Sequence, residues 1–323
     1  MTRVAVCVCT RRRPQSLDRL LASLSGQRFE GEPPEVELVV VDNDPDATAR
    51  PVVDAWSGRI GWPARYAVES RRGIPRARNR ALEEVPGGTD VVAFVDDDEW
   101  AAPRWLDHLL EGLRRHGADV ATGPRLPLYP EEVPEWIARA RLFRGNRHRT
   151  GQEVPIAYTH NVAFRAGILG ELEHGFDTDL TDVGGSDTEF FHRVRALGRT
   201  IVWVDEAAVF EPVPEGRASA RWLLRRFFRY GTTAGLLQRR PETTLSGAAA
   251  RAARELGRAA LSPLRLAALP YEGRGACLRF ALDWSYAAGF LAGWAGFGFP
   301  EYGRRRRRAS DRESVPSATS VDL

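Results

Sequence analysis

Three adjacent aspartates are the densest group of side chains in the sequence that could do chemistry. Asp96, Asp97 and Asp98 directly follow the apolar run of residues 91–95. Adjacent carboxylates repel one another, so three of them at a strand end are unfavourable unless a cation lies beside them. Hard divalent ions such as Mg²⁺ and Mn²⁺ prefer oxygen ligands and also bind substrate phosphates. The cluster therefore predicts metal-assisted chemistry on a phosphate-bearing substrate, while a solvated acidic turn after an edge strand stays an alternative.

Two further polar clusters follow apolar runs nearer the start of the chain. Thr10 and Arg11 come after residues 4–8, and Asp42 comes after residues 36–41. Runs of this length without polar alternation are typical of strands that are buried on both faces. In sheets of that kind, ligands bind beyond the carboxyl ends of the strands. The three clusters are therefore expected to meet at one edge of a sheet, and that edge is the predicted site.

The segments between the apolar runs have helical spacing. Leucines recur at positions 17, 20, 21 and 24, and prolines 75 and 103 open two further stretches that run to 82 and 113. A third strand is expected near residues 65–68 and a fourth over 90–95. This alternation predicts an α/β fold with a mostly parallel sheet covered by helices on both faces.

Composition excludes several classes of protein. With 323 residues, 43% hydrophobic, the chain is long enough for a large α/β domain with an appendage, and it is neither fibrous nor disordered. The formal net charge of +3 does not indicate a nucleic-acid partner. The three cysteines lack the spacing of a disulfide framework or a metal site. The chain runs into its first strand without a signal peptide, so a cytoplasmic location is expected.

The character of the sequence changes after residue 212. A basic, aromatic helix is expected over 217–230, an alanine- and arginine-rich helix over 248–269, and a strongly apolar segment over 281–300. Residues 123–151 are rich in proline and arginine and are expected to be irregular. We therefore expect a catalytic domain over 1–212, a helical extension over 213–303, and a disordered tail over 304–323.

Five short motifs occur in order along the first two-thirds of the chain. They are Val-Cys-Val-Cys-Thr-Arg at 6–11, Val-Val-Val-Asp-Asn at 39–43, Gly-Ile-Pro-Arg-Ala-Arg-Asn at 73–79, Phe-Val-Asp-Asp-Asp-Glu at 94–99, and Gly-Ser-Asp-Thr-Glu-Phe at 185–190. In this order the chain resembles family-two glycosyltransferases of the GT-A fold, particularly bacterial exopolysaccharide and cell-envelope enzymes. The resemblance covers about residues 3–212.

The resemblance implies roles for the residues at the sheet edge. Thr10, Arg11 and Asp42 would hold the nucleoside of a nucleotide-sugar donor, and Arg78 and Asn79 would lie near its diphosphate. Asp98 matches the metal-binding carboxylate of the family signature. Asp96 would bind the ribose or the ion, and Asp97 would be one of the nucleotide-binding residues. The implied cofactor is Mn²⁺ or Mg²⁺.

The remaining roles lie further along the chain. Asp187 matches the general base of the family, with Glu189 as the second choice, and residues 159–161 resemble the segment that lines the donor-sugar and acceptor pocket. Many members carry a metal-binding histidine where this chain has Glu211. The glutamate is a candidate metal ligand, since its oxygens suit a hard ion, or else a surface residue.

The expected function is an inverting transfer of a sugar from a nucleotide-diphosphate donor to an acceptor hydroxyl. The acceptor would be a glycan, a lipid-linked sugar or a small molecule, in polysaccharide, glycolipid or natural-product synthesis. A nucleotidyltransferase acting on sugar phosphates and a non-catalytic nucleotide-binding protein stay open. A dinucleotide-binding oxidoreductase is disfavoured because no glycine fingerprint follows the first strand.

An anionic membrane surface is expected as a further partner. Residues 284–299 carry no charge, and an arginine run follows at 304–308. Sixteen residues are fewer than the roughly 20 that span a bilayer. The segment is therefore expected either to lie on the inner face of the plasma membrane or to pack on protein.

Overall fold

The computed structural model describes residues 1–298 except for 132, 135, 138–142, 144–146 and 240–244. The chain divides into two compact units. The first comprises Met1–Leu128 and Arg141–Pro212, and the second comprises Tyr129–Ala140 and Val213–Leu323. Residues 129–140 thus belong to the second unit and not to the first. The predicted tail at 304–323, with its arginine run, lies outside the described residues.

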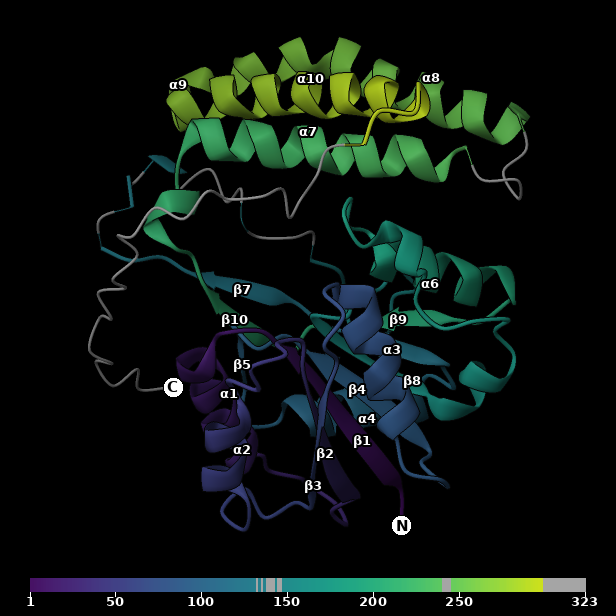
Figure 1. The fold of residues 1–323 in the computed structure, drawn as a ribbon. Helices are drawn as coiled ribbons and strands as arrows, with labels where there is room; N and C mark the ends of the chain where they lie inside the picture. The colour runs from purple at the N-terminus through teal and green to yellow at the C-terminus, as the bar shows by residue number, and fades with distance from the viewer. Residues whose placement is uncertain (132, 135, 138–142, 144–146, 240–244, 299–323) are drawn as a thin grey trace. The chain divides into compact units, whose positions relative to one another are not determined.

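The first unit is built on a seven-stranded sheet (Figure 1). The order of its strands is β3-β2-β1-β4-β8-β6-β9. They are β1 (Arg3–Thr10), β2 (Glu35–Asp42), β3 (Ala64–Val68), β4 (Val91–Val95), β6 (Val120–Thr122), β8 (Asn161–Arg165) and β9 (Ile201–Trp203). β8 runs antiparallel to β4 and β6, and the other pairs are parallel. The predicted mixed, mostly parallel sheet is confirmed.

Each face of this sheet is buried under its own set of helices. The residues of β1 alternate between the faces. Val4, Val6 and Val8 share one core with α1 (Pro14–Ser25), α2 (Arg50–Trp56) and α4 (Trp105–Arg115). Ala5 and Cys7 share the other with α3 (Ile74–Glu84) and α6 (Ser186–Ala196), where five phenylalanines cluster. In Figure 1, α1 and α2 lie beside one face of the sheet and α3 beside the other.

The first unit also contains a second, three-stranded sheet. It consists of β5 (Trp100–Ala101), β10 (Val209–Pro212) and β7 (Arg125–Leu128), in that order. The expectation that residues 123–151 are irregular is wrong for β7. This strand forms because it pairs with β10, more than 80 residues later, and a local pattern does not show such a partner. Two short 3-10 helices, η1 (Ala166–Gly170) and η2 (Thr178–Leu180), precede α6.

The second unit is helical. Its elements are η3 (Glu215–Arg217), α7 (Ala220–Leu237), α8 (Leu245–Leu261), η4 (Ser262–Ala268), α9 (Leu269–Glu272) and α10 (Arg274–Trp294). The helix expected over 248–269 changes to a 3-10 helix at Ser262, because Pro263 has no backbone N–H to continue the α-helical pattern. No helix among the described residues is long and apolar enough to cross a membrane.

Candidate active site

The carboxyl ends of β1, β2 and β4 bring the three polar clusters together. Thr10 is paired with Asp42 across the parallel strands β1 and β2, and β4 lies on the other side of β1. The Thr10 hydroxyl donates a hydrogen bond of 2.7 Å to Oδ2 of Asp97, in a fully buried position. The predicted convergence of these clusters at one edge is therefore confirmed. Their roles toward a substrate stay predictions.

Arg13 pairs with two of the three aspartates of the cluster. One of its guanidinium nitrogens donates to Oδ1 of Asp97 at 3.0 Å and to Oδ2 of Asp98 at 2.8 Å. Arg12 turns away, with a left-handed φ of 55°, and pairs with Asp44 and Asp46. Arg11, the arginine that the sequence singled out, makes no ion pair or side-chain hydrogen bond within the described residues. It is therefore free to meet an anionic ligand.

Two carboxyls of the cluster, Asp96 and Asp97, hold protons more tightly than ordinary carboxyls do. Burial raises the pKa of Asp96 to about 7; Arg78 opposes this rise, while Asp98, Asp97 and Asp187 add to it. Burial likewise raises the pKa of Asp97 to about 6, against the effect of Arg13. A bound cation would relieve both the burial cost and the repulsion between the carboxylates.

The donor set fits a hard divalent ion that is shared with a substrate. Within the described residues, no group of three or more histidines, cysteines or acidic residues is arranged to hold a metal by itself. Mg²⁺ in nucleotide enzymes is commonly held by only one or two carboxylates, with substrate phosphates and water completing its shell. Asp98, whose side chain is partly exposed, and Asp96 supply oxygens of that kind.

Glu211, the other candidate ligand, is engaged in an ion pair. Its Oε2 lies 2.8 Å from a guanidinium nitrogen of Arg125, on the neighbouring strand β7. Nearby, the ring of His160 stacks on Tyr158, and its Nδ1 is 3.9 Å from Oε1 of the buried Glu99. A metal role for Glu211 would require it to leave or share Arg125, and it stays a prediction.

Asp42 and Asn43, at the carboxyl end of β2, fix the loops that follow β2 and β3. Asp42 is fully buried and accepts hydrogen bonds from the backbone N–H groups of Asp44 and Ala49 and from the Tyr66 hydroxyl. The side-chain amide of Asn43 donates to the carbonyls of Glu69 and Arg71, and its oxygen accepts from the N–H of Gly73. Both side chains thus fix backbone, and contact between Asp42 and a nucleoside is untested.

Arg78 and Asn79, on α3, hold the segment that leads into α6. Arg78 is buried and donates to the Ser186 hydroxyl at 3.0 Å. Asn79 makes two hydrogen bonds to the backbone of Phe176, accepting from its N–H at 2.6 Å and donating to its carbonyl at 2.8 Å. The part that the structure assigns to both residues is therefore to position α6, and contact with the nucleotide stays a prediction.

Asp187 lies in the first turn of α6. The helix begins after Gly185, whose φ of 87° is unfavourable for other residues, and Oδ1 of Asp187 accepts from the N–H of Thr188 at 2.7 Å. The charge of Asp187 is among those that raise the pKa of Asp96. Glu189, by contrast, is buried and paired with Arg193 at 2.7 Å. The geometry favours Asp187 over Glu189 as the base.

A family comparison agrees with this arrangement. The sequence model described as glycosyl transferase family 2 matches residues 5–173, just over half of the chain. The chain belongs to glycosyl transferase family 2. The match contains the carboxyl ends of β1, β2 and β4 and the whole of α3.

Relatives of this family 2 glycosyltransferase cover most of its length. The succinoglycan biosynthesis protein ExoM of Rhizobium meliloti is 35% identical over 234 residues, which are 72% of this chain and 74% of that protein. The glucosyl-dolichyl phosphate glucuronosyltransferase of Haloferax volcanii is 26% identical over 247 residues, which are 71% of this chain and 74% of that protein.

A solved structure supports the fold. The mannosyltransferase PcManGT from Pyrobaculum calidifontis, in complex with GDP-Man and Mn²⁺, has a TM-score of 0.62 and 20% identity, and the match covers 90% of this chain and 86% of that one. The predicted GT-A fold is confirmed, and the chain is a nucleotide-sugar glycosyltransferase.

Sequence reasoning about this glycosyltransferase missed two residues of the site. Arg13 was passed over because three consecutive arginines look alike, and only the turn at Arg12 decides which one reaches the aspartates. Asn43 ends the motif at 39–43, which gives it no role of its own. Its position one residue after a strand end, 30 residues before Gly73, gave no local signal that the two are bonded.

Proposed function

We propose that this glycosyltransferase is metal-dependent and inverts the configuration at the anomeric carbon. The observation that supports this most directly is the carboxylate cluster itself: Asp96 and Asp97 have raised pKa values, and Arg13 bridges Asp97 and Asp98. Such a cluster is suited to a divalent ion and a diphosphate together. The Mn²⁺ and GDP-Man in the Pyrobaculum enzyme support the same pairing of ion and donor.

Asp98 and Asp96 would hold the ion, Mn²⁺ or Mg²⁺. When bound, it supplies positive charge next to the diphosphate leaving group. Thr10, Arg11 and Asp42 would receive the nucleoside end of the donor. Because Arg11 has no partner within the described residues, its guanidinium group can donate hydrogen bonds to the nucleoside.

Asp187 would act as the general base. It would accept the proton of the acceptor hydroxyl while that oxygen attacks the anomeric carbon from the face opposite the nucleotide. Asp187 lies in the first turn of α6, where the helix N-terminus carries a partial positive charge. A single base suffices for this displacement, and no covalent nucleophile is needed.

The acceptor is proposed to be a hydroxyl of a growing glycan or a lipid-linked sugar. The names of the Rhizobium and Haloferax relatives, succinoglycan biosynthesis and glucosyl-dolichyl phosphate, support polysaccharide or glycolipid synthesis. Work on such acceptors suits an enzyme that lies peripherally on the inner face of the plasma membrane. Transfer of nucleotides to sugar phosphates is the less favoured function, since the comparisons all support glycosyl transfer.

A donor screen tests the proposal. Purified full-length protein is incubated with UDP-, GDP- and dTDP-sugars in Mn²⁺, in Mg²⁺ and in excess EDTA, and release of the nucleoside diphosphate is measured. We expect release from one nucleotide class, only with a divalent ion, and, once an acceptor is found, a product of inverted anomeric configuration by NMR. Release that is undiminished in EDTA, or a product that retains the configuration of the donor, would contradict the proposal.

A further inference from the structure

One face of α10 is apolar and exposed. Trp284, Ala288, Leu291 and Trp294 follow one another at intervals of four, three and three residues, which places them on one stripe of the helix. The three large side chains are 48%, 41% and 39% exposed, respectively. No charged residue interrupts this stripe, which we call the α10 stripe.

The opposite face of α10 is already filled by α7. A Cβ added to Gly289 would overlap the carbonyl oxygen of Phe228, and one added to Gly231 would overlap the carbonyl oxygen of Tyr286. The two helices therefore pack backbone to backbone through their glycines, as small residues permit in helix pairs within membranes. The α10 stripe thus has no packing role between α7 and α10, and it is left exposed when these helices pair.

Exposed apolar side chains are concentrated in this part of the chain. Of the fifteen large hydrophobic residues that are exposed among the described ones, ten lie between Leu256 and Phe297. They include Leu264 at 72% exposed and Tyr271 at 89%. Single exposed hydrophobics are ordinary on a protein surface, but a concentration of this kind marks an interaction surface.

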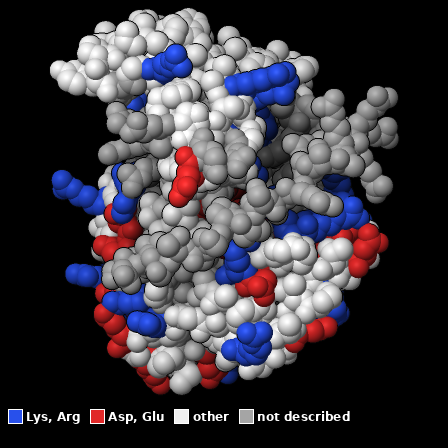
Figure 2. All heavy atoms as spheres, turned by 90° about the vertical axis from the view of Figure 1, so that its left-hand side faces the viewer, with Lys and Arg blue, Asp and Glu red and all other residues white. Residues whose placement is uncertain are grey.

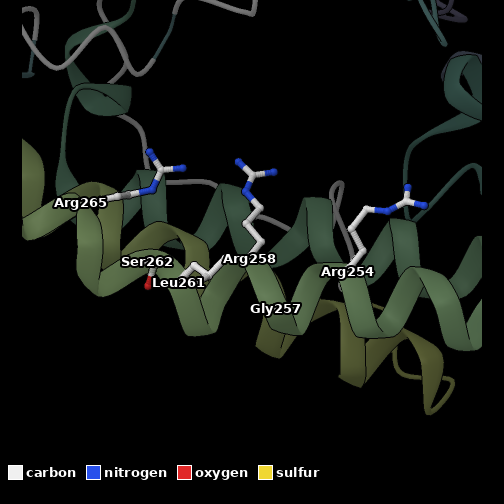
Figure 3. A pocket seen from close by; sticks show the side chains of 6 residues that line it. All are labelled: Arg254, Gly257, Arg258, Leu261, Ser262 and Arg265. Atoms are coloured by element: carbon white, nitrogen blue, oxygen red, sulfur yellow. The ribbon is translucent and has the colours of Figure 1, made fainter.

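The same part of the chain carries an excess of positive charge. Residues 213–303 contain thirteen arginines and six acidic residues, whereas residues 1–212 contain 27 arginines and 34 acidic residues. Figure 3 shows Arg254, Arg258 and Arg265 around a shallow depression, with their guanidinium groups on the same side of α8. Arg258 and Arg265 share the single carboxylate of Asp283, and Arg254 has no partner within the described residues. The excess is therefore not neutralised internally.

We propose that the second unit docks on the surface of an anionic phospholipid bilayer, with the α10 stripe in the interfacial layer. Tryptophan prefers the depth of the lipid headgroups, and two of the four residues of the stripe are tryptophans. The positive charge of the unit complements an anionic leaflet and draws the protein to it. Since no described helix can span the bilayer, the unit lies on the membrane.

Vesicle flotation tests this docking with the full-length chain and without any sugar donor, so its outcome is independent of the transfer reaction. Wild-type protein is expected to float with vesicles of phosphatidylglycerol and phosphatidylcholine, and to float much less with phosphatidylcholine alone or in high salt. The triple variant Trp284→Ser, Leu291→Ser, Trp294→Ser keeps all of the arginines and should lower the partition coefficient at least about tenfold.

Leu197→Ser is the matched control, because Leu197 is 42% exposed in the first unit and lies outside the stripe. It should float like the wild type. Circular dichroism establishes that the triple variant is folded, and sedimentation velocity without lipid gives its oligomeric state. Wild-type protein that stays with the unbound fraction, or a triple variant that floats normally, would overturn the proposal. So would a wild-type dimer that the triple variant loses while vesicle binding is unchanged, because the stripe would then contact a second copy of the chain.

Discussion

At the end of β4, a bound cation would compete with protons for the same carboxylate oxygens. The pKa of Asp96 is raised from its ordinary value of 3.8 to about 7, so near neutral pH the carboxyl is partly protonated without a cation. Metal binding must then displace the proton. Donor affinity measured in Mn²⁺ is therefore expected to rise as the pH increases through about 7.

The same shift predicts how stability depends on pH in EDTA. A raised pKa means that the folded state binds the proton more tightly than the unfolded state. The stabilisation is present below the ordinary value of 3.8 and is lost as the pH rises through about 7. Asp96→Asn has no such proton to lose. The melting temperature of Asp96→Asn should therefore rise relative to that of the wild type by about 7–14 °C between pH 4 and pH 7.

Thermal unfolding at a series of pH values, in EDTA, measures this difference. Asp54→Asn, at an exposed site on α2, is the control and should follow the wild type at every pH. A constant difference between Asp96→Asn and the wild type across this range would show that the pKa of Asp96 is not raised.

The assignment of the base is tested by two neighbouring carboxyls. Asp187→Asn should lower turnover by about 10²- to 10⁴-fold and leave donor affinity nearly unchanged, because the base meets the acceptor. Glu189→Gln should mainly lower the melting temperature, because Glu189 pairs with Arg193 in the interior. Transfer assays and nucleotide-sugar titrations on both variants decide which of the two carboxyls is the base. Normal turnover in Asp187→Asn together with an inactive Glu189→Gln would move the base to Glu189.

Sequence alone locates the aspartates but does not give their partners. Asp96 to Asp98 stand out because an apolar strand precedes them, which is a local pattern. That Thr10 and Arg13 bind them across more than 80 residues depends on the pairing of β1 with β4. Asn79 was expected to meet the nucleotide, yet its amide binds the backbone of Phe176, and no spacing in the sequence indicates that contact.

At the scale of elements, α3 is bonded through Arg78 and Asn79 to Ser186 and Phe176, at the start of α6 and in the segment before it. Asn79→Ala removes both hydrogen bonds to the backbone of Phe176 and should destabilise the first unit by about 1–3 kcal/mol. It should also lower turnover, since the segment before Asp187 is less firmly held. Urea unfolding and turnover measure the two effects. Arg80→Ala, one residue on, breaks only the surface pair with Glu84 and should change neither by much.

If Asn79→Ala and Arg80→Ala unfold at the same urea concentration, Asn79 has no positioning role.

Elements were predicted well where one segment carried the whole pattern, as in β1, β2 and α1. The short strands β7 and β10 were not, because each is stabilised mainly by the other.

The close packing of α7 against α10 at their glycines leads to a prediction about the stability of the second unit. Gly289→Ala would force the helices apart at the carbonyl of Phe228 and should unfold the second unit at a lower temperature. Gly257→Ala, on α8, meets no atom within 4 Å and should be neutral or stabilise the helix by up to about 1 kcal/mol. Thermal unfolding followed by circular dichroism compares them. Equal melting temperatures would contradict the backbone contact between α7 and α10.

At the scale of the whole molecule, charge is distributed unevenly along the chain although the net charge is only +3. The first 212 residues have an acidic excess and residues 213–303 a basic one. On the face in Figure 2, acidic and basic side chains lie intermixed, without one broad patch of a single sign. The basic excess of residues 213–303 is the part of this charge pattern on which the proposed docking at a lipid surface depends.

The central claim is that the aspartates at the end of β4 hold the ion on which sugar transfer depends. Asp98→Asn keeps the size of the side chain but gives the ion no negative charge, and the pair with Arg13 is partly exposed, so the fold should remain intact. The decisive measurement is the rate of sugar transfer in Mn²⁺ and in excess EDTA, for the wild type, for Asp98→Asn and for the exposed control Asp54→Asn. The account predicts that the wild type and the control transfer sugar in Mn²⁺ but not in EDTA. It predicts no transfer by Asp98→Asn under either condition. Full transfer by Asp98→Asn, or undiminished wild-type transfer in EDTA, would contradict it.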